Sequence, residues 1–120
     1  MQYMLLIYSN EAAEAQAMQS MSPAERDAVL GQWYGYTEAL KSAKVYIAGD
    51  ALQPTSMATT VRLRDSERMV TDGPFAETKE QLGGYYLIEV KDLDEALAWA
   101  AKCPGASYGS VEVRPVMVFS

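Results

Sequence analysis

Residues 71–84 read T-D-G-P-F-A-E-T-K-E-Q-L-G-G, a turn-rich stretch between two strand-like segments. Asp72-Gly73 is good turn chemistry, Pro74 fixes the next backbone angle, and Phe75 offers an anchor for the loop in the core. The glycine pair at 83–84 predicts a β-bulge or a close approach of another backbone. The stretch therefore separates a hairpin from the strand that follows it.

The segments on either side of this stretch alternate like strands. Residues 57–63 alternate apolar and polar side chains, residues 65–67 form a turn, and residues 68–71 return as the partner of a hairpin. After the stretch, residues 84–90 predict a strand. One of its faces carries Tyr86, Ile88 and Val90, and the other carries Tyr85, Leu87 and Glu89.

Two helices are predicted from their starts. Ser22-Pro23-Ala24-Glu25 combines a capping hydroxyl, proline at the first helical position and glutamate three residues after the cap, and this helix runs to about Ala43. Its apolar stripe consists of Val29, Trp33, Tyr36 and Leu40. A second helix starts at Asp92 and ends at about Lys102, where Cys103-Pro104-Gly105 stops it, and residues 12–18 predict a further short helix.

Three further strands complete the pattern. Residues 3–8 are apolar on both alternating faces, as in a central strand covered from both sides, and residues 45–49 are β-branched and aromatic. Residues 111–118 form the last strand, in which Pro115 favours an edge position or a bulge. We therefore expect residues 1–120 to form one α+β domain, a ferredoxin-like split β-α-β unit with an inserted β-hairpin.

An antiparallel sheet of this type carries its helices on one side. The other face then exposes apolar and aromatic residues of several strands, a patch that is unusually large for a monomer. A twofold contact lets such a patch bury itself. The sequence thus predicts a homodimer with two sheets packed face to face, a dimeric α+β barrel.

Composition excludes several kinds of partner. The formal charge of -6 repels phosphate backbones and anionic lipid, so we expect no nucleic acid and no membrane partner. The longest apolar run, residues 3–8, is far shorter than a membrane span, and we expect a cytoplasmic protein. The single cysteine, Cys103, excludes an internal disulfide and is interpreted as a small half-buried residue.

The chain contains no histidine. Nucleophile pairs with histidine, histidine metal sites and histidine general bases are therefore excluded. Proton transfer would have to use carboxylates, Tyr, Lys or Cys103. We predict no metal site built from several cysteines or histidines and no bound organic cofactor.

The stretch at 72–86 carries a family resemblance. Asp72-Gly73-Pro74-Phe75, the following A-E-T-K-E and Gly83-Gly84-Tyr85-Tyr86 resemble the signature of the DGPF-domain proteins, which belong with the YCII-related proteins. The resemblance covers nearly the whole chain and implies the same dimeric α+β barrel. It implies no settled reaction.

The sequence departs from that family at two positions. Related YCII-type proteins carry a helix histidine in about the stretch that reads Gln32-Trp33-Tyr34-Gly35 here, and a histidine often stands where Tyr108 does. The resemblance therefore implies no catalytic histidine for this chain. Tyr108 keeps the ability to form hydrogen bonds.

Candidate site residues follow from these patterns. The signature crowds ionisable groups onto one loop, where Asp72 and Glu77 are candidates for acid-base chemistry, with turn construction as the alternative. Tyr34 lies off the centre of the helix stripe and is predicted to face a cleft, together with Phe75 as a second wall. Tyr108 and Arg114 are candidates for orienting a ligand, although strand arginines commonly line a wet face.

Two functions remain open at this point. The first is a homodimer that binds a small organic ligand in a cleft between helix and sheet, with or without enzymatic turnover. The second is a non-enzymatic dimeric partner or regulator. The resemblance permits a link to an alternative sigma factor in that case, because similar family members are often encoded with one.

Overall fold

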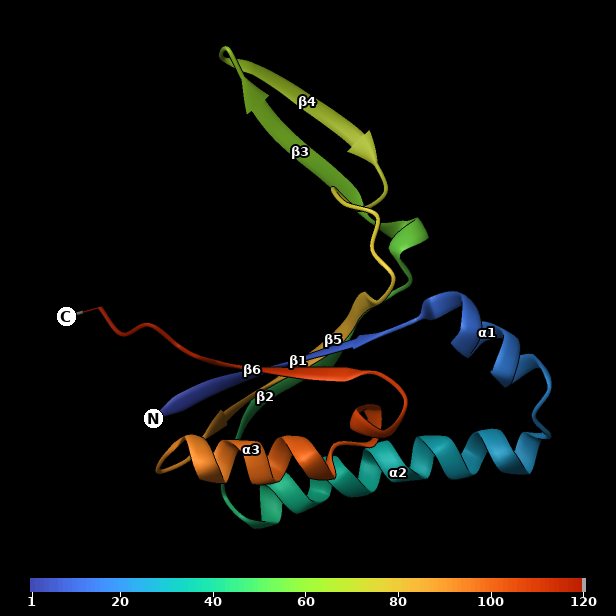
Figure 1. The fold of residues 1–120 in the computed structure, drawn as a ribbon, viewed down its shortest axis with the longest axis vertical. Helices are drawn as coiled ribbons and strands as arrows, with labels where there is room; N and C mark the ends of the chain where they lie inside the picture. Colours follow the sequence, from blue (N-terminus) through green and yellow to red (C-terminus); the bar gives the residue numbers. More distant parts are fainter. Residues whose placement is uncertain (120) are drawn as a thin grey trace.

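Residues 1–119 are described in the computed structural model, and they form a sheet-and-helix body with a separate hairpin (Figure 1). The body consists of β1 (Gln2–Ser9), α1 (Glu11–Gln19), α2 (Pro23–Ser42), β2 (Tyr46–Ala51), β5 (Gln81–Glu89), α3 (Leu93–Lys102) and β6 (Ser110–Pro115). The hairpin consists of β3 (Thr59–Arg64) and β4 (Glu67–Asp72), and short 3-10 turns cover Thr55–Met57 and Pro104–Ser107.

The four body strands form one antiparallel sheet in the order β2-β5-β1-β6. This is the ferredoxin-like arrangement, with the hairpin inserted between β2 and β5. It confirms the predicted α+β fold. Pro115 ends β6, which is an edge strand, as the missing backbone N–H of proline predicted.

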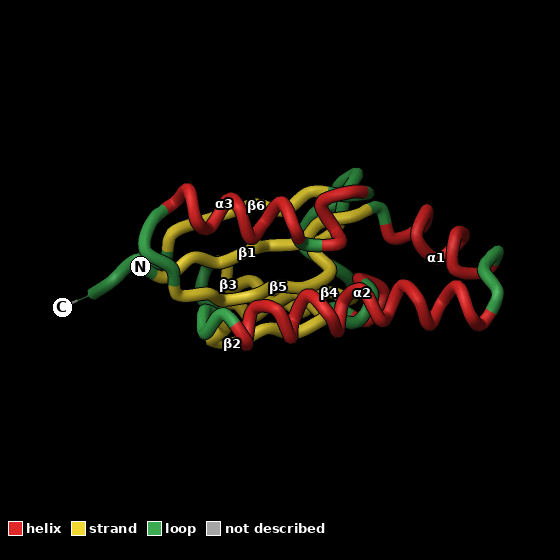
Figure 2. The backbone as a smooth tube through the Cα atoms, turned by 90° about the horizontal axis from the view of Figure 1, so that it is seen from below, coloured by secondary structure: helices red, strands yellow, loops and turns green. Residues whose placement is uncertain are grey.

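The two long helices lie on the same side of this sheet (Figures 1 and 2). The N-terminus of α2 has the predicted capping box, since Ser22 Oγ accepts from the Glu25 amide at 3.2 Å and Glu25 Oε1 accepts from the Ser22 amide at 3.0 Å. Asp92 Oδ1 accepts from the Glu95 amide at 2.9 Å at the start of α3. Both helices therefore begin where the capping residues predicted.

The core lies between the helices and the sheet. Leu5 on β1, Leu40 on α2 and Ile88 on β5 are completely buried, and burial of each such side chain contributes roughly 1.5–3 kcal/mol. Cys103 is only 2% exposed, so it is more deeply buried than the expected half-buried residue. Burial raises the pKa of its thiol, which agrees with a packing role rather than a reactive one.

Both predicted roles of the glycine pair are confirmed. Ile7 pairs with Gly84 and Tyr8 pairs with Leu82, so Gly83 is the extra residue of a β-bulge. A Cβ atom on Gly84 would lie 3.0 Å from the Asp50 carbonyl oxygen of β2. The bulge and the close approach explain why two glycines occur at this point of β5.

The β3–β4 hairpin, called the arm below, projects away from the body on the side of the sheet opposite the helices (Figures 1 and 2). Its turn is at Asp65 and Ser66, whose φ values of 52° and 67° match the right-handed twist of the flanking strands. Val61 pairs with Val70, and Leu63 pairs with Arg68, so one face of the arm carries three aliphatic side chains. All three are more than half exposed.

Several expectations need correction. The strand at 3–8 is central, but only its Tyr3, Leu5 and Ile7 face is covered within one chain. Phe75 is 76% exposed and does not anchor its loop in the core. β5 begins at Gln81 rather than Gly84, because the bulge lets the glycines stay within the strand.

The face of the sheet away from the helices, called the open face below, carries apolar side chains from the two central strands. Because strand neighbours alternate, the side chains next to the buried ones point to the opposite face. These are Met4, Leu6, Tyr8, Tyr85 and Leu87, all half-buried. The arm and residues 116–119 after β6, called the C-terminal segment below, both extend from the body on the side of the open face (Figure 1).

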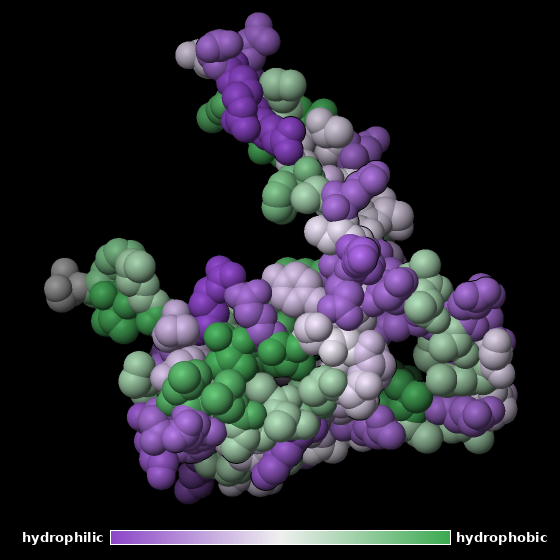
Figure 3. Space-filling view, viewed as in Figure 1, coloured by the Kyte–Doolittle hydropathy of each residue, from purple (hydrophilic) through white to green (hydrophobic). Residues whose placement is uncertain are grey.

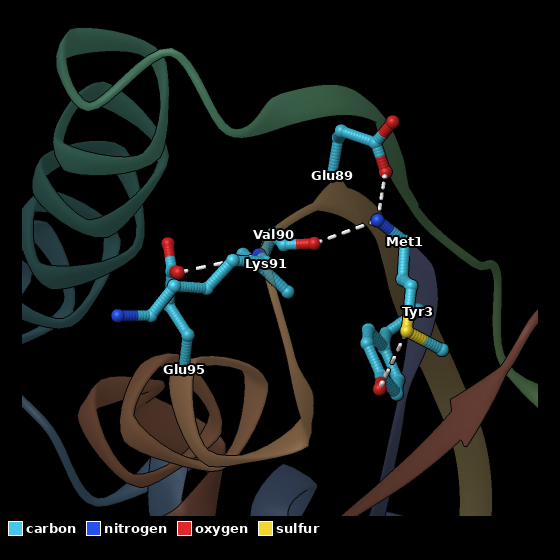
Figure 4. Close-up of polar contacts among 6 residues, drawn as sticks. All are labelled: Met1, Tyr3, Glu89, Val90, Lys91 and Glu95. Carbon is cyan, nitrogen blue, oxygen red and sulfur yellow. Dashed lines mark hydrogen bonds and ion pairs between the residues drawn. The ribbon is translucent and has the colours of Figure 1, made fainter.

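Contacts at the first residue join the start of β1 to the end of β5. The Met1 amino group donates to the Val90 carbonyl at 2.7 Å and lies 3.0 Å from Glu89 Oε2 (Figure 4). Lys91 N donates to Glu95 Oε2 at 3.3 Å, which links the same corner to α3. No helix within residues 1–119 is both long enough and apolar enough to cross a membrane.

Candidate functional site

A cavity of about 490 Å³ lies where α1, α2 and the loop after α3 meet the end of the sheet. This volume is within the range of pockets that hold small organic molecules. Glycines at 49, 83 and 84 form part of its lining. Since they carry no side chains, the space above the ends of β2 and β5 remains free.

The α2 wall of the cavity combines rings with one hydroxyl. Trp33 is half-buried against the core, and Tyr34 is 68% exposed. Thr37, one turn after Trp33, donates from Oγ1 to the Trp33 carbonyl at 3.0 Å. Its only hydroxyl proton is then used, so Thr37 Oγ1 accepts from Tyr86 OH, which lies 2.7 Å away.

Tyr86 therefore presents its phenol oxygen at the floor of the cavity with free acceptor capacity. Its ring is edge-on to Tyr36, with centroids 5.3 Å apart, and edge-on to Tyr46 at 6.3 Å. Burial raises the pKa of Tyr86. The phenol stays protonated at neutral pH.

Glu14 on α1 and Tyr108 after α3 lie at the far side of the cavity. Burial raises the pKa of Tyr108, and the negative charge of Glu14 raises it further. The Glu14 carboxylate is half-buried and acts electrostatically on the tyrosine. This side of the cavity is therefore electronegative.

Two of the predicted site residues line this cavity and four do not. Tyr34 and Tyr108 contribute to its walls. Asp72 ends β4 and Glu77 lies in the loop after it, and both are exposed. Within residues 1–119 neither carboxylate has a hydrogen-bond or ion-pair partner. Phe75 lies in the same loop, so residues 72–77 of the signature belong to the root of the arm, whereas its residues 83–86 border the cavity.

Arg114 lies on the open face of the sheet. It pairs with Met4 in the register of β1 and β6, and its Nε donates to Glu112 Oε2 at 2.7 Å. Its guanidinium is thus engaged with a neighbour on its own strand and is largely exposed. Arg62 and Arg64 are likewise exposed on the arm, which agrees with the wet-face alternative for strand arginines.

Sequence reasoning missed the polar floor of the cavity. Thr37 lies four residues after Trp33, so a hydroxyl within an apolar helix stripe was the available signal. Tyr86 was predicted to share a face of its strand with Ile88 and Val90, and this is the buried face that meets the helices. Its pairing with Thr37 depends on how α2 lies on the sheet. Glu14 gave no signal, because its position depends on the course of α1.

Two residues that border the cavity, Asp50 and Tyr85, direct their side chains to the open face of the sheet. Asp50 pairs with Tyr85, and both are therefore on the opposite face of the sheet from Tyr86. Tyr85 OH donates to Asp50 Oδ2 at 2.8 Å, which raises the pKa of Tyr85. Their backbones border the cavity, while their side chains belong to the open face.

The described residues contain no group of three or more His, Cys, Asp or Glu side chains that could hold a metal ion. The chemistry available in the cavity is therefore that of phenols, the Ser9 and Thr37 hydroxyls and the Glu14 carboxylate. These groups bind and orient a molecule through hydrogen bonds, ring contacts and charge.

The family model of the YCII-related domain matches residues 1–120. This chain belongs to the YCII-related family. An uncharacterized protein of Rhizobium meliloti (strain 1021) is 39% identical over 129 residues, which cover 99% of this chain and 94% of that protein.

In this YCII-related protein, the helix turn where the resemblance implied a histidine supplies Trp33 and Tyr34 to the cavity. Tyr108, at the second departure, lines the same cavity. The two departures from the family pattern therefore meet in space.

Proposed function

We propose that this YCII-related protein is a homodimer that binds a small organic ligand in the cavity between α2 and the sheet. The observation that carries the proposal is the cavity itself. Aromatic rings form part of its walls, and Thr37 and Tyr86 place hydrogen-bonding oxygens at its floor. Apolar walls with a few convergent polar groups are typical of ligand sites.

Ligand binding is tested by a thermal-shift screen of a metabolite library. A ligand that binds the folded chain raises the melting temperature by mass action. The Tyr34→Ala variant removes an exposed ring from the cavity wall at little cost to the core, and Phe75→Ala is its matched control on the signature loop. We expect a hit to stabilise the wild type and Phe75→Ala, and to stabilise Tyr34→Ala less.

The opposite pattern of thermal shifts would place the ligand site at the signature loop. If Phe75→Ala abolishes the shift and Tyr34→Ala keeps it, the ligand binds beside Asp72 and Glu77 instead of in the cavity. If no metabolite shifts the wild type, and pull-downs return a reproducible protein partner, the docking-platform alternative replaces ligand binding.

The homodimer is supported by uncovered apolar surface on two elements. No element within residues 1–119 covers the open face of the sheet or the aliphatic face of the arm. Figure 3 shows further apolar surface on the C-terminal segment, where Met117, Val118 and Phe119 are at least 73% exposed. A second copy of the chain, stacked on the open face between arm and C-terminal segment, would cover these surfaces together.

Light scattering tests the dimer. We expect a mass of two chains at micromolar concentration and a single chain for Leu6→Glu, which places a charge in the middle of the open face. Ala28→Glu, an exposed position on α2, is the matched control and should remain a dimer. A wild type that stays monomeric would sink the dimer and leave the cavity proposal standing, since the cavity lies within one chain.

Catalytic turnover by Asp72 and Glu77 stays a prediction, and it requires a site shared between two copies of the chain. Neither residue lines the cavity of its own chain, so a shared site requires the arm of one copy to reach the cavity of the other. Mixing Asp72→Asn subunits with Tyr34→Ala subunits tests this requirement. Turnover of a ligand found in the screen, restored in the mixed dimer, would support a shared site.

A further inference from the structure

The charge and ring content of the cavity indicate which ligands it accepts, provided that the proposed cavity function holds. Five aromatic rings contribute to its lining. They are Trp33, Tyr34, Tyr46, Tyr86 and Tyr108. Of the described residues in the lining, none is lysine or arginine.

Aromatic faces attract cations, because the ring quadrupole is negative above the plane, and tryptophan is the best of the ring types in this respect. The nearest example in this protein is Lys41, whose Nζ lies 5.1 Å from the centroid of the Tyr46 ring. One ring of the cavity thus already takes part in a contact of this kind. Among residues 1–119, no Lys or Arg lies over the other four rings of the cavity.

Glu14 adds a full negative charge to the same space. Its carboxylate lies on the α1 side of the cavity and, within residues 1–119, has no ion-pair partner. It acts on Tyr108, whose pKa it raises after the larger effect of burial. An anionic ligand would meet this charge without a compensating lysine or arginine.

The phenol groups of Tyr86 and Tyr108 add no negative charge to the cavity at neutral pH. Burial raises the pKa of both Tyr86 and Tyr108, so both stay protonated. Tyr86 OH donates a hydrogen bond to Thr37 Oγ1, and the lone pairs of its oxygen remain available to accept from an amine N–H or to attract a quaternary ammonium group by charge. The site therefore offers acceptors, rings and one carboxylate, which together suit a positively charged organic group.

We propose that the cavity selects small organic monocations, with an ammonium group directed toward Glu14 and the Tyr86 oxygen and an apolar part held among the rings. Neutral ligands of the same shape would use only the ring contacts. Carboxylates and phosphates would be excluded by Glu14. The substrate class that follows is amines and quaternary ammonium compounds.

The test compares three probes of matched shape: choline, its uncharged tert-butyl isostere, and the carboxylate in which the alcohol of that isostere is oxidised. Affinities are measured by NMR titration of the wild type and of Glu14→Gln. Glu38→Gln is the matched control, because it removes the same charge from an exposed position on α2. We expect choline to bind about tenfold more tightly than the isostere, and the carboxylate to show the weakest affinity.

The variants separate the contributions. Glu14→Gln should reduce the preference for choline by about threefold or more while leaving the affinity of the isostere unchanged, and Glu38→Gln should leave both unchanged. Equal binding of choline and the isostere, or a preference that survives in Glu14→Gln, would overturn cation selection. Binding of the isostere or the carboxylate in the cavity would still support the proposed function.

Failure of the proposed function has a different signature. In that case none of the three probes perturbs cavity signals at millimolar concentration, and the metabolite screen also gives no hit that depends on Tyr34. The selectivity proposal then fails together with the site. A hit of neutral or negative charge that depends on Tyr34 overturns the selectivity alone.

Discussion

The body and the arm of this protein use similar strand patterns with opposite results. In β5, alternate side chains such as Tyr86 and Ile88 are buried beneath the helices. In β3 and β4 the alternation is equally clear, yet every side chain except Thr60 is exposed. An alternating pattern therefore predicts a strand, while burial depends on whether a second layer exists to cover it.

The difference also divides the signature, because its residues 83–86 border the cavity of the body while residues 72–75 lie beside the arm. Pro74 and Gly73 of the signature lie at the root of the arm, where Gly73 has a φ of 91° and its amide donates to the Ala58 carbonyl. The cavity is formed instead by the body. The four predictions below test this division between body and arm.

The largest effect is expected from the core of the body. Ile88→Ala removes a completely buried side chain from β5 and should lower the free energy of unfolding by about 2–5 kcal/mol at every protein concentration. Leu63→Ala, on the aliphatic face of the arm, is the control. Urea denaturation at two protein concentrations should show a loss for Leu63→Ala that depends on concentration, since its contacts would be made only with a second chain.

The arm itself is tested by Val61→Ser combined with Val70→Ser. These two residues face each other on the aliphatic side of the hairpin, so the double variant should weaken dimerisation by about tenfold to a hundredfold. Sedimentation measures the dissociation constant. Thr60→Ser combined with Thr71→Ser changes the opposite face and should have little effect. Equal weakening by both pairs would contradict the assignment of the contact to one face.

Packing within the body is tested at Gly109. A Cβ atom there would collide with the Tyr8 carbonyl oxygen, so Gly109→Ala forces the backbone to move and should cost about 1–3 kcal/mol. Gly31→Ala is the control, because nothing lies within 4 Å of its Cβ position in α2. Alanine favours helix over glycine, and this variant should gain about 0.5–1 kcal/mol in the same urea titration.

The smallest effect on stability at neutral pH is expected from two buried groups of the body, the Tyr36 phenol and the Cys103 thiol. Their effect on stability becomes larger at alkaline pH. Burial raises the pKa of Tyr36 above its ordinary value of 10.0 and that of Cys103 above 9.0, so the folded state holds these protons more tightly than the unfolded chain. Their contribution is complete below these ordinary values. It is lost as the pH rises toward the folded pKa values, by about 1.4 kcal/mol per pH unit and group.

Melting curves at increasing pH measure this loss. Tyr36→Phe should melt at a lower temperature than the wild type near neutrality, because it lacks the 2.7 Å hydrogen bond to the Trp99 carbonyl. The corresponding loss in the free energy of unfolding should be about 1 kcal/mol. Its decline above pH 10 should be shallower than that of the wild type. Tyr34→Phe, an exposed tyrosine on the same helix, is the control. An unchanged alkaline slope in Tyr36→Phe would contradict the role of its burial.

Local chemistry predicted the elements of the fold closely. Caps at Ser22 and Asp92 set both helix starts, the glycine pair marked the bulge, and Pro115 indicated an edge strand. Each of these signals acts within a few residues of the chain. Composition similarly excludes histidine chemistry, because the chain has no imidazole side chain.

The sequence by itself determined which segments form helices and strands, which side chains share a face of β5, and the absence of an imidazole. Only the tertiary structure brought Glu14, Thr37, Tyr86 and Tyr108 around one cavity and left Asp72, Glu77 and Phe75 outside it. The physical reason is distance along the chain. Caps, turns and alternation depend on neighbouring residues, whereas a cavity depends on how α1, α2 and the loop after α3 lie against the sheet.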